Sequence, residues 1–379
     1  DNGVMKMQQY DVVVVGAGVI GSAVASGILR KGCSVALLDD GGRAFNASVG
    51  NFGLIWVQGK GQGARSYAEW CLKASDIFPA FARLLQDQTG IDLAYRKPGG
   101  LVLCHGEAEF QNRVRILERL KNESRSGTYD CRMLDRQQAQ EFLPDLKLGT
   151  GITGASYSPH DGYLNPLSLL KALHKSFALG GGQFYAGSAV VDIRRQKKGF
   201  LVATHGRSFS AKKIVLAAGN AIPRLAAMVG MQIQVHPEQG QLMVTERVKP
   251  VLSMPISGIQ QTAEGSFMVG LSNRDVGFNT ETDVKILKQM ATRVVNAFPA
   301  LSRLKIVRCW SSLRVLSADG LPIYQESENC PGAYAVTSHS GVTLAPLHHS
   351  VLSDWIVDGR RPEEFESFST RRFDIEKTA

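Results

Sequence analysis

The chain has 379 residues, of which 44% are hydrophobic and 20% charged, a length that predicts two domains and a composition ordinary for a soluble α/β enzyme. Its net charge of +9 is scattered in short pairs such as Arg194-Arg195 without a basic tail interleaved with aromatics, which argues against nucleic-acid binding. Six cysteines without Cys-x-x-Cys or Cys/His spacing predict reduced thiols, a cytoplasmic location and no metal site.

A glycine-rich turn follows the first apolar run. Four valines at 12–15 precede Gly16, Gly18 and Gly21, and a helical pattern continues to Leu29. Gly16 permits the tight turn, Gly18 lets a pyrophosphate approach the backbone, and Gly21 lets the helix pack on the sheet. Asp39 closes the next apolar run, where a carboxylate binds a ribose hydroxyl. This pattern predicts an adenine dinucleotide and leaves both NAD and FAD open.

The same segment has two other interpretations. Residues 12–29 are uncharged, and their length approaches that of a membrane helix. The glycines inside the segment and the strand after it argue against a transmembrane helix. A signal peptide cut near Ala23-Val24-Ala25 would remove the first strand of a unit whose second strand is intact, so we reject that interpretation too.

The rest of the chain predicts a discontinuous arrangement. Helical spacing covers 63–89 and 107–124, a helix at 167–179 opens after 161–166, strand alternation covers 231–307, and the turn at 338–341 opens a last helix. Strands suited to the first sheet recur at 10–40, 183–219 and 333–357, which favours FAD over a continuous NAD domain. The predicted FAD-binding domain is 1–88, 152–222 and 308–379, and the predicted substrate domain is 89–151 and 223–307.

Several motifs together resemble the glycine/D-amino-acid oxidase (DAO) family of FAD oxidoreductases. They are Gly16-Ala17-Gly18-Val19-Ile20-Gly21 with Asp39, Ser48-x-x-Asn51-x-Gly53, Ala217-Ala218-Gly219, Gln239-Gly240-Gln241, Trp310-x-x-Leu313-Arg314, 319–322 and 339–346. Residues 319–324 and 338–346 are most similar to the β subunits of D-hydroxyproline dehydrogenase and opine oxidase, with hydrogen cyanide synthase subunits next. Ser338 departs from the pattern, because the family usually has glycine there.

The resemblance implies an α/β fold, α+β overall, with a Rossmann-like FAD domain of the glutathione-reductase type and an inserted antiparallel-sheet substrate domain. Asp39 is expected to bind the adenosine ribose while Asp40 faces solvent, and Val190 to contact adenine through its backbone. The residues expected at the cofactor are Gly16, Gly18, Val19, Ile20, Gly21, Asp39, Asp40, Ser48, Asn51, Gly53, Leu54, Val190, Ala218, Gly219, Arg314, Gly341, Val342 and Thr343.

The implied reaction is hydride transfer from the carbon beside an amine to flavin N5, giving an imine that water hydrolyses. Arg314 is expected to hold the substrate carboxylate through two parallel hydrogen bonds, the alternative being an ion pair between domains. The backbone from His339 to Thr343 would stabilise negative charge on the reduced flavin, and the His339 side chain is either catalytic or structural. Trp56 and Gln58 are expected to line the substrate cavity, and the alternative for Trp56 is a packed position in the core.

The tyrosines leave an open choice, since Tyr67, Tyr163 and Tyr324 are unranked candidates for the site. The expected partners are a small carboxylate-bearing amine and, from the narrower resemblance, redox subunits of a heteromer that accept the electrons. The alternatives are an oxygen-using glycine or D-amino-acid oxidase, an NAD-dependent dehydrogenase, and an FAD-carrying assembly subunit with an idle pocket. The sequence does not decide among substrates or electron acceptors.

Overall fold

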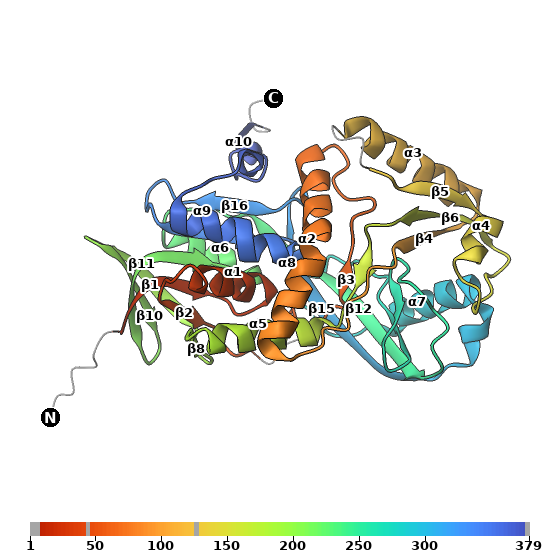
Figure 1. Ribbon diagram of the computed structural model, residues 1–379, viewed down its shortest axis with the longest axis horizontal. Helices are drawn as coiled ribbons and strands as arrows, with labels where there is room; N and C mark the ends of the chain where they lie inside the picture. The colour runs from red at the N-terminus through yellow and green to blue at the C-terminus, as the bar shows by residue number, and fades with distance from the viewer. Residues whose placement is uncertain (1–7, 43–45, 125–128, 376–379) are drawn as a thin grey trace.

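The structure is a computed structural model that describes residues 8–42, 46–124 and 129–375. Along its long axis, one half is built on a mostly parallel sheet and the other on antiparallel sheets (Figure 1). Helix α2 (Arg65–Thr89) runs between the two halves. Both termini of the described chain belong to the half with the parallel sheet.

The larger sheet has eight strands on the path β16-β17-β11-β1-β2-β8, and the hairpin of β9 and β10 joins it at β11. The strands are β1 (Gln8–Val15), β2 (Val35–Leu38), β8 (Gln183–Tyr185), β9 (Val190–Gln196), β10 (Gly199–Thr204), β11 (Ser208–Leu216), β16 (Ile323–Glu326) and β17 (Ala333–Thr337). In parallel pairs, β1 contacts β2 on one side and β11 on the other. Three distant parts of the sequence therefore supply one sheet, as the recurring strand signals predict.

Burial explains why β1 is a run of valines rather than an alternating strand. Val12, Val14 and Val13, Val15 belong to two different buried clusters, one on each face of the sheet. A parallel strand covered on both faces has no polar side. Helix α1 (Val19–Leu29) is also buried around most of its circumference, because α5, α8 and α9 pack against it.

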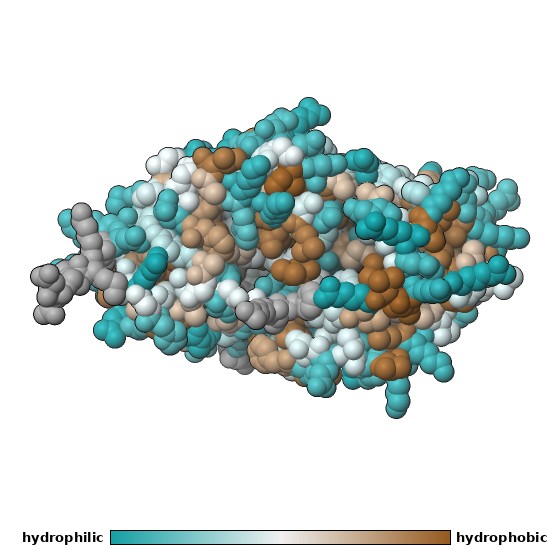
Figure 2. Space-filling model, turned by 90° about the horizontal axis from the view of Figure 1, so that it is seen from below, coloured by the Kyte–Doolittle hydropathy of each residue, from teal (hydrophilic) through white to brown (hydrophobic). Residues whose placement is uncertain are grey.

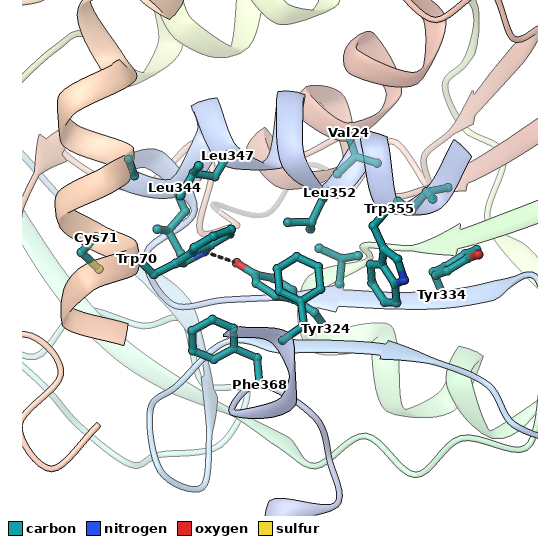
Figure 3. Packing of buried hydrophobic residues seen from close by; sticks show 14 of the residues in the cluster. Val24, Trp70, Cys71, Tyr324, Tyr334, Leu344, Leu347, Leu352, Trp355 and Phe368 are labelled. Carbon is teal, nitrogen blue, oxygen red and sulfur yellow. Dashed lines mark hydrogen bonds between the residues drawn. The ribbon is translucent and has the colours of Figure 1, made fainter. Parts of the chain in front are cut away.

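An aromatic cluster fixes the C-terminal helices against α2. Trp70 of α2 donates its indole N–H to the Tyr324 hydroxyl over 3.3 Å, and Phe368 packs against both rings (Figure 3). The Tyr324 hydroxyl also lies 3.0 Å from Nε2 of the fully buried His348. These contacts position the helical segment that begins at Gly341.

The parallel half and its border carry most of the helices, and those from 341 to 358 follow one another without a break. The helices here are α1, α2, α5 (Pro166–Leu179), α6 (Ile222–Ala227), α8 (Gly341–Leu347), a π-helical turn (His348–Leu352), α9 (Ser353–Asp358) and α10 (Arg372–Ile375), with 3₁₀ turns at Gly219–Ala221 and Glu363–Glu366. Asn165 caps α5 by accepting hydrogen bonds from Leu167 N and Ser168 N, with Pro166 at its first position.

The antiparallel half holds a four-stranded sheet of order β13-β14-β12-β15 and a three-stranded sheet of order β4-β6-β5. Its elements are β4 (Gly100–His105), α3 (Glu107–Glu123), β5 (Arg132–Asp135), α4 (Arg136–Glu141), β6 (Ile152–Ser158), β12 (Val235–Arg247), β13 (Ile259–Gln261), β14 (Ser266–Val269), α7 (Val284–Ala297), a 3₁₀ turn (Pro299–Arg303) and β15 (Ile306–Ser317). The short strands β3 (Leu54–Ile55) and β7 (Gly162–Tyr163) pair near the junction of the halves.

The predicted FAD-binding domain includes 152–222 and 308–379, but two strands in these segments, β6 and β15, do not join the parallel sheet. β6 pairs with β4 and β5, and β15 pairs along its length with β12. Both strands come just before a turn motif, at 161–166 and at 319–322, so boundaries drawn from motifs start too early in the chain. The division into an FAD-binding and a substrate domain otherwise stays a prediction.

The surface is mainly polar. Figure 2 shows hydrophilic side chains over much of one face, interrupted by separate hydrophobic patches. Large exposed apolar side chains include Phe278, Val284 and Val307. Within the described residues, no helix combines the length and apolar character that crossing a bilayer requires.

Candidate functional site

The turn between β1 and α1 is shaped by contacts that exclude any side chain. Gly16 has a φ of +104°, and a Cβ there would lie 2.4 Å from the carbonyl oxygen of Ala217. A Cβ on Gly21 would lie 1.9 Å from the Gly16 carbonyl oxygen. The turn therefore packs directly on the end of β11, where Ala218 and Gly219 begin the next turn.

Asp39 faces this turn from the end of β2. Its Oδ2 accepts a hydrogen bond from Ala17 N over 2.8 Å and its Oδ1 from Gly41 N over 2.9 Å. Its carbonyl oxygen accepts from Ser188 N, which brings the segment ahead of Val190 to the same place. Asp40 is exposed and accepts a hydrogen bond from Gly42 N. The geometry fits a ligand at Asp39, because a carboxylate has lone pairs for further donors.

A loop from 46 to 55 covers the start of α1. Gly18 is the N-cap of α1 without a capping side chain, and Ser48 Oγ accepts instead from Val19 N over 2.9 Å. The side chain of Asn51 bonds the carbonyls of Ala47 and Ser48 and the N–H of Gly53. Asn51 therefore fixes the loop rather than offering its amide to a ligand.

The same loop is tied to the helix at the C-terminal end. Gly53 has a φ of +76°, and its neighbour Leu54 pairs with Tyr163. Farther along, Trp56 N donates to Thr343 Oγ1 over 3.1 Å. A Cβ on Gly341 would lie 3.1 Å from Ile20 Cγ1, so the starts of α1 and α8 face each other. Val342 packs on the apolar cluster beneath them.

These contacts form an unbroken series from Asp39 through Ala17, Val19 and Ser48 to the start of α8. An extended dinucleotide needs close backbone approach at one end, a carboxylate for its ribose, and polar backbone along its length. Glycines 16, 18 and 341 let the neighbouring segments pack closely along this line, because a Cβ at each would lie 2.4 Å from Ala217, 2.7 Å from Ser48 and 3.1 Å from Ile20. The residues present therefore fit FAD.

Arg314 lies on β15 with one edge of its guanidinium held by protein. Its Nη1 donates to Glu238 Oε1 over 2.8 Å, to Asn273 Oδ1 over 2.6 Å and to the Ser272 carbonyl over 3.0 Å. Glu238 is its cross-strand neighbour on β12. Within the described residues, Nη2 and Nε have no hydrogen-bond acceptor, and that edge is available for a carboxylate. The ion pair joins two adjacent strands, and it does not exclude the expected role in substrate binding.

The side chain of His339 reaches solvent on one side and lies against protein atoms on the other, which remove part of its hydration. This desolvation, together with the positive charges of Lys60 and Arg314, lowers the pKa of His339 to about 3. The imidazole is therefore neutral at physiological pH. The next residue, Ser340, accepts at its Oγ from Lys60 Nζ over 2.6 Å and lies 2.6 Å from the Tyr67 hydroxyl. Among the three candidate tyrosines, Tyr67 is the one that contacts this loop.

Comparison with known proteins assigns the family. The profile of the DAO family, "FAD dependent oxidoreductase", matches residues 11–355. The chain belongs to the DAO family of FAD-dependent oxidoreductases. Both the predicted cofactor, FAD, and the predicted mixed α/β fold are confirmed.

Relatives of this DAO-family chain match it over nearly its whole length. An opine oxidase subunit of Rhizobium meliloti is 35% identical, over 98% of this chain and all of the relative. The crystal structure of glycine oxidase from Geobacillus kaustophilus superimposes with a TM-score of 0.86 at 26% identity, covering 94% of this chain and 96% of that one. L-Proline dehydrogenase from P. horikoshii shares the fold, with a TM-score of 0.84 at 18% identity over 98% and 99% of the two chains.

Three residues of the site region were missed by sequence reasoning: Lys60, Glu238 and Asp161 as a buried charge. Asp161 is fully buried and accepts from Val57 N over 2.6 Å and from Gln58 Nε2 over 2.7 Å. Burial raises its pKa to about 6. Of the three missed residues, Lys60 is the one that the sequence could have indicated, because a lysine between two glycines, as in Gly59-Lys60-Gly61, is unusual in an apolar region.

The same network corrects the interpretation of Gln58 as a cavity residue. Its side chain is 2% exposed and bonds Asp161, the Gly100 carbonyl and Arg113. Gln58 therefore joins the loop to the antiparallel half. Trp56 is partly exposed, with its ring against Gly100, so it keeps both predicted roles open.

Proposed function

We propose that this chain oxidises the C–N bond of a small carboxylate-bearing amine, a D-amino acid, an imino acid or an opine. The observation that carries the proposal is the edge of Arg314 that has no partner in the described part of the chain, near His339 and the start of α8. Its relatives include a subunit of an opine oxidase and a glycine oxidase. Bound FAD supplies the hydride acceptor, flavin N5.

The chain's own residues have distinct roles in this proposal. Arg314 binds the substrate carboxylate through Nη2 and Nε and so orients the C–H bond, while Glu238 holds the guanidinium in place from the opposite edge. The positive charges of Lys60 and Arg314 disfavour a proton on His339. The backbone at Gly341–Thr343 and the glycine turn hold the cofactor, with Asp39 at its ribose.

The electrons are proposed to leave through a partner subunit. Two relatives, from Rhizobium meliloti and Agrobacterium tumefaciens, are each one subunit of an opine oxidase, which supports a heteromer. Among the described residues, the cysteines are free thiols, which fits a reducing, cytoplasmic compartment and leaves this part of the chain without a thiolate cluster of its own. An oxygen-using oxidase and an idle FAD-carrying subunit are the alternatives.

Turnover of an amine panel tests the proposal. The purified chain, loaded with FAD, is assayed with D-proline, glycine, sarcosine and octopine, with either an artificial dye or oxygen as acceptor. We expect dye reduction faster than oxygen consumption, and a large loss of activity in Arg314→Ala. Full-rate peroxide formation by the isolated chain would favour the simple oxidase. Activity of the heteromer that is unchanged in Arg314→Ala would favour the idle subunit.

A further inference from the structure

The loop from Trp56 to Lys60 is held in place at every step. Trp56 N bonds Thr343, Val57 N and Gln58 N bond the buried Asp161, and Gly59 N donates to the Tyr129 hydroxyl over 2.9 Å. Gly59 and Gly61 both have positive φ, of +83° and +79°. The backbone at Lys60 is therefore held in place, and the Lys60 ammonium donates to Ser340 Oγ.

The ammonium of the partly exposed Lys60 has few protein partners at this position. Its hydrogen-bond partner among the described residues is Ser340 Oγ, which leaves two of its three N–H donors without an acceptor. The described carboxylates lie beyond ion-pair distance of Nζ, and Asp161, the negative group that acts on it, already accepts three hydrogen bonds. Burial lowers the pKa of Lys60. An ammonium with unused donors can form charge-assisted hydrogen bonds to an anionic ligand.

A second cation approaches the same histidine from the antiparallel half. Arg314 and Lys60 come from β15 and from the loop before α2, and both repel a proton on His339. Among the residues that the structure describes, one edge of Arg314 has no partner and Lys60 has two donors without an acceptor. Two cations that flank one exposed group, each with unused donors, match a ligand with two negative ends.

We propose that Lys60 binds a second carboxylate of the substrate, so that the preferred substrates are secondary amines with a carboxylate on each arm. This inference rests on the proposed function and narrows it to iminodicarboxylates, the chemical class to which opines belong. Arg314 holds the carboxylate beside the carbon that is oxidised, and Lys60 holds the carboxylate of the other arm. A monocarboxylate amine uses Arg314 alone.

Binding of ligands that cannot be oxidised tests this directly. FAD-loaded protein is titrated with thiodiglycolate, which has two carboxylates, and with (methylthio)acetate, which has one, and the flavin absorbance change gives each Kd. We expect wild type to bind the dicarboxylate about 10- to 100-fold more tightly, as one added charged contact predicts. Lys60→Met should abolish this preference and leave the Kd of (methylthio)acetate unchanged, while Lys60→Arg should retain part of the preference.

Lys175→Met is the control, because Lys175 is an exposed lysine that, like Lys60, donates a hydrogen bond to the protein, here to the Thr89 carbonyl at the end of α2. It should keep the wild-type preference. Two results in Lys60→Met would overturn the proposal: an equal rise in the Kd of both ligands, or an altered midpoint potential of the ligand-free flavin. Either would mean that Lys60 contacts the flavin and not the second carboxylate. A preference that persists in both Lys60→Met and Lys60→Gln would also overturn it.

Turnover separates this inference from the proposed function. Oxidation of sarcosine and iminodiacetate at rates that do not depend on Lys60 would refute the second carboxylate site and leave amine oxidation standing. Binding that depends on Lys60, without oxidation of any amine in the panel, would refute the proposed function alone.

Discussion

The two ends of the site are held by different kinds of contact. The β1–α1 turn is a close packing of backbone on backbone, in which Gly16 and Gly21 leave no room for a methyl group. The junction around Lys60 and Arg314 is an open network of charged and polar side chains from both halves of the molecule. We therefore expect an added atom to destabilise the turn and its FAD binding, and a removed charge to weaken substrate binding at the junction.

Adding one carbon to the turn should have the largest effect. In Gly21→Ala, the new Cβ meets the Gly16 carbonyl oxygen, and α1 must move away from the sheet. We expect the free energy of unfolding to fall by more than about 3 kcal/mol, together with loss of FAD. Urea unfolding and the ratio of flavin to protein absorbance measure both.

Gly206→Ala is the control for this change, since nothing lies within 4 Å of a Cβ at that position. It should keep wild-type stability and FAD content. Normal flavin content in Gly21→Ala would contradict the close-packed account of the turn.

Removing the buried charge under the junction should change the pH dependence of stability. Burial raises the pKa of Asp161 to about 6, above the value of about 3.9 in an unfolded chain, so the folded state binds this proton more tightly. Protonated Asp161 therefore stabilises the folded state. This contribution to the free energy of unfolding, about 3 kcal/mol, is complete below pH 4 and is lost as the pH rises through 6. The difference in unfolding free energy between wild type and Asp161→Asn should therefore fall across this window.

The exposed Asp145 supplies the comparison for that substitution. Urea unfolding of wild type, Asp161→Asn and Asp145→Asn from pH 4 to pH 7 gives the three curves. A constant gap between wild type and Asp161→Asn would mean that Asp161 does not titrate in this range.

Replacing Arg314 by lysine tests the junction without removing the charge. A lysine ammonium cannot bond Glu238 on one side and a carboxylate bidentately on the other. We expect kcat/KM for carboxylate amines to fall by about 100-fold, close to 3 kcal/mol, with FAD content unchanged. Arg314→Ala should lose more, and the exposed Arg195→Lys should lose nothing. An unchanged KM in Arg314→Lys and Arg314→Ala would remove Arg314 from the substrate site.

The smallest of these effects is expected at the ribose end. Asp39→Ala loses the hydrogen bonds to Ala17 N and Gly41 N as well as the expected ribose contact, and should weaken FAD binding by about 1–2 kcal/mol. Asp40→Ala should change little, because that side chain is exposed. Isothermal titration of the apoprotein with FAD measures both. A larger effect at Asp40 would place the ribose contact one residue later in the chain.

The contrast also explains what the sequence could and could not predict. Gly16, Gly18, Gly21 and Asp39 act within one βαβ unit, so their spacing alone carries the information. Lys60 and Ser340 are far apart in the chain, as are Arg314 and Glu238, and only the packed fold brings each pair together. Asp161 resembles a helix-opening residue in sequence, and its burial depends on the loop at Val57 and Gln58 and on Gly100 of the antiparallel half.

Anaerobic reduction of the bound flavin tests the central claim most directly. The purified chain should be yellow, with an absorbance band near roughly 450 nm that a D-imino acid or an opine bleaches in the absence of oxygen. The bleaching should be much slower in Arg314→Ala at equal flavin content. A folded, FAD-loaded chain whose band survives every carboxylate-bearing amine in the panel would contradict the account.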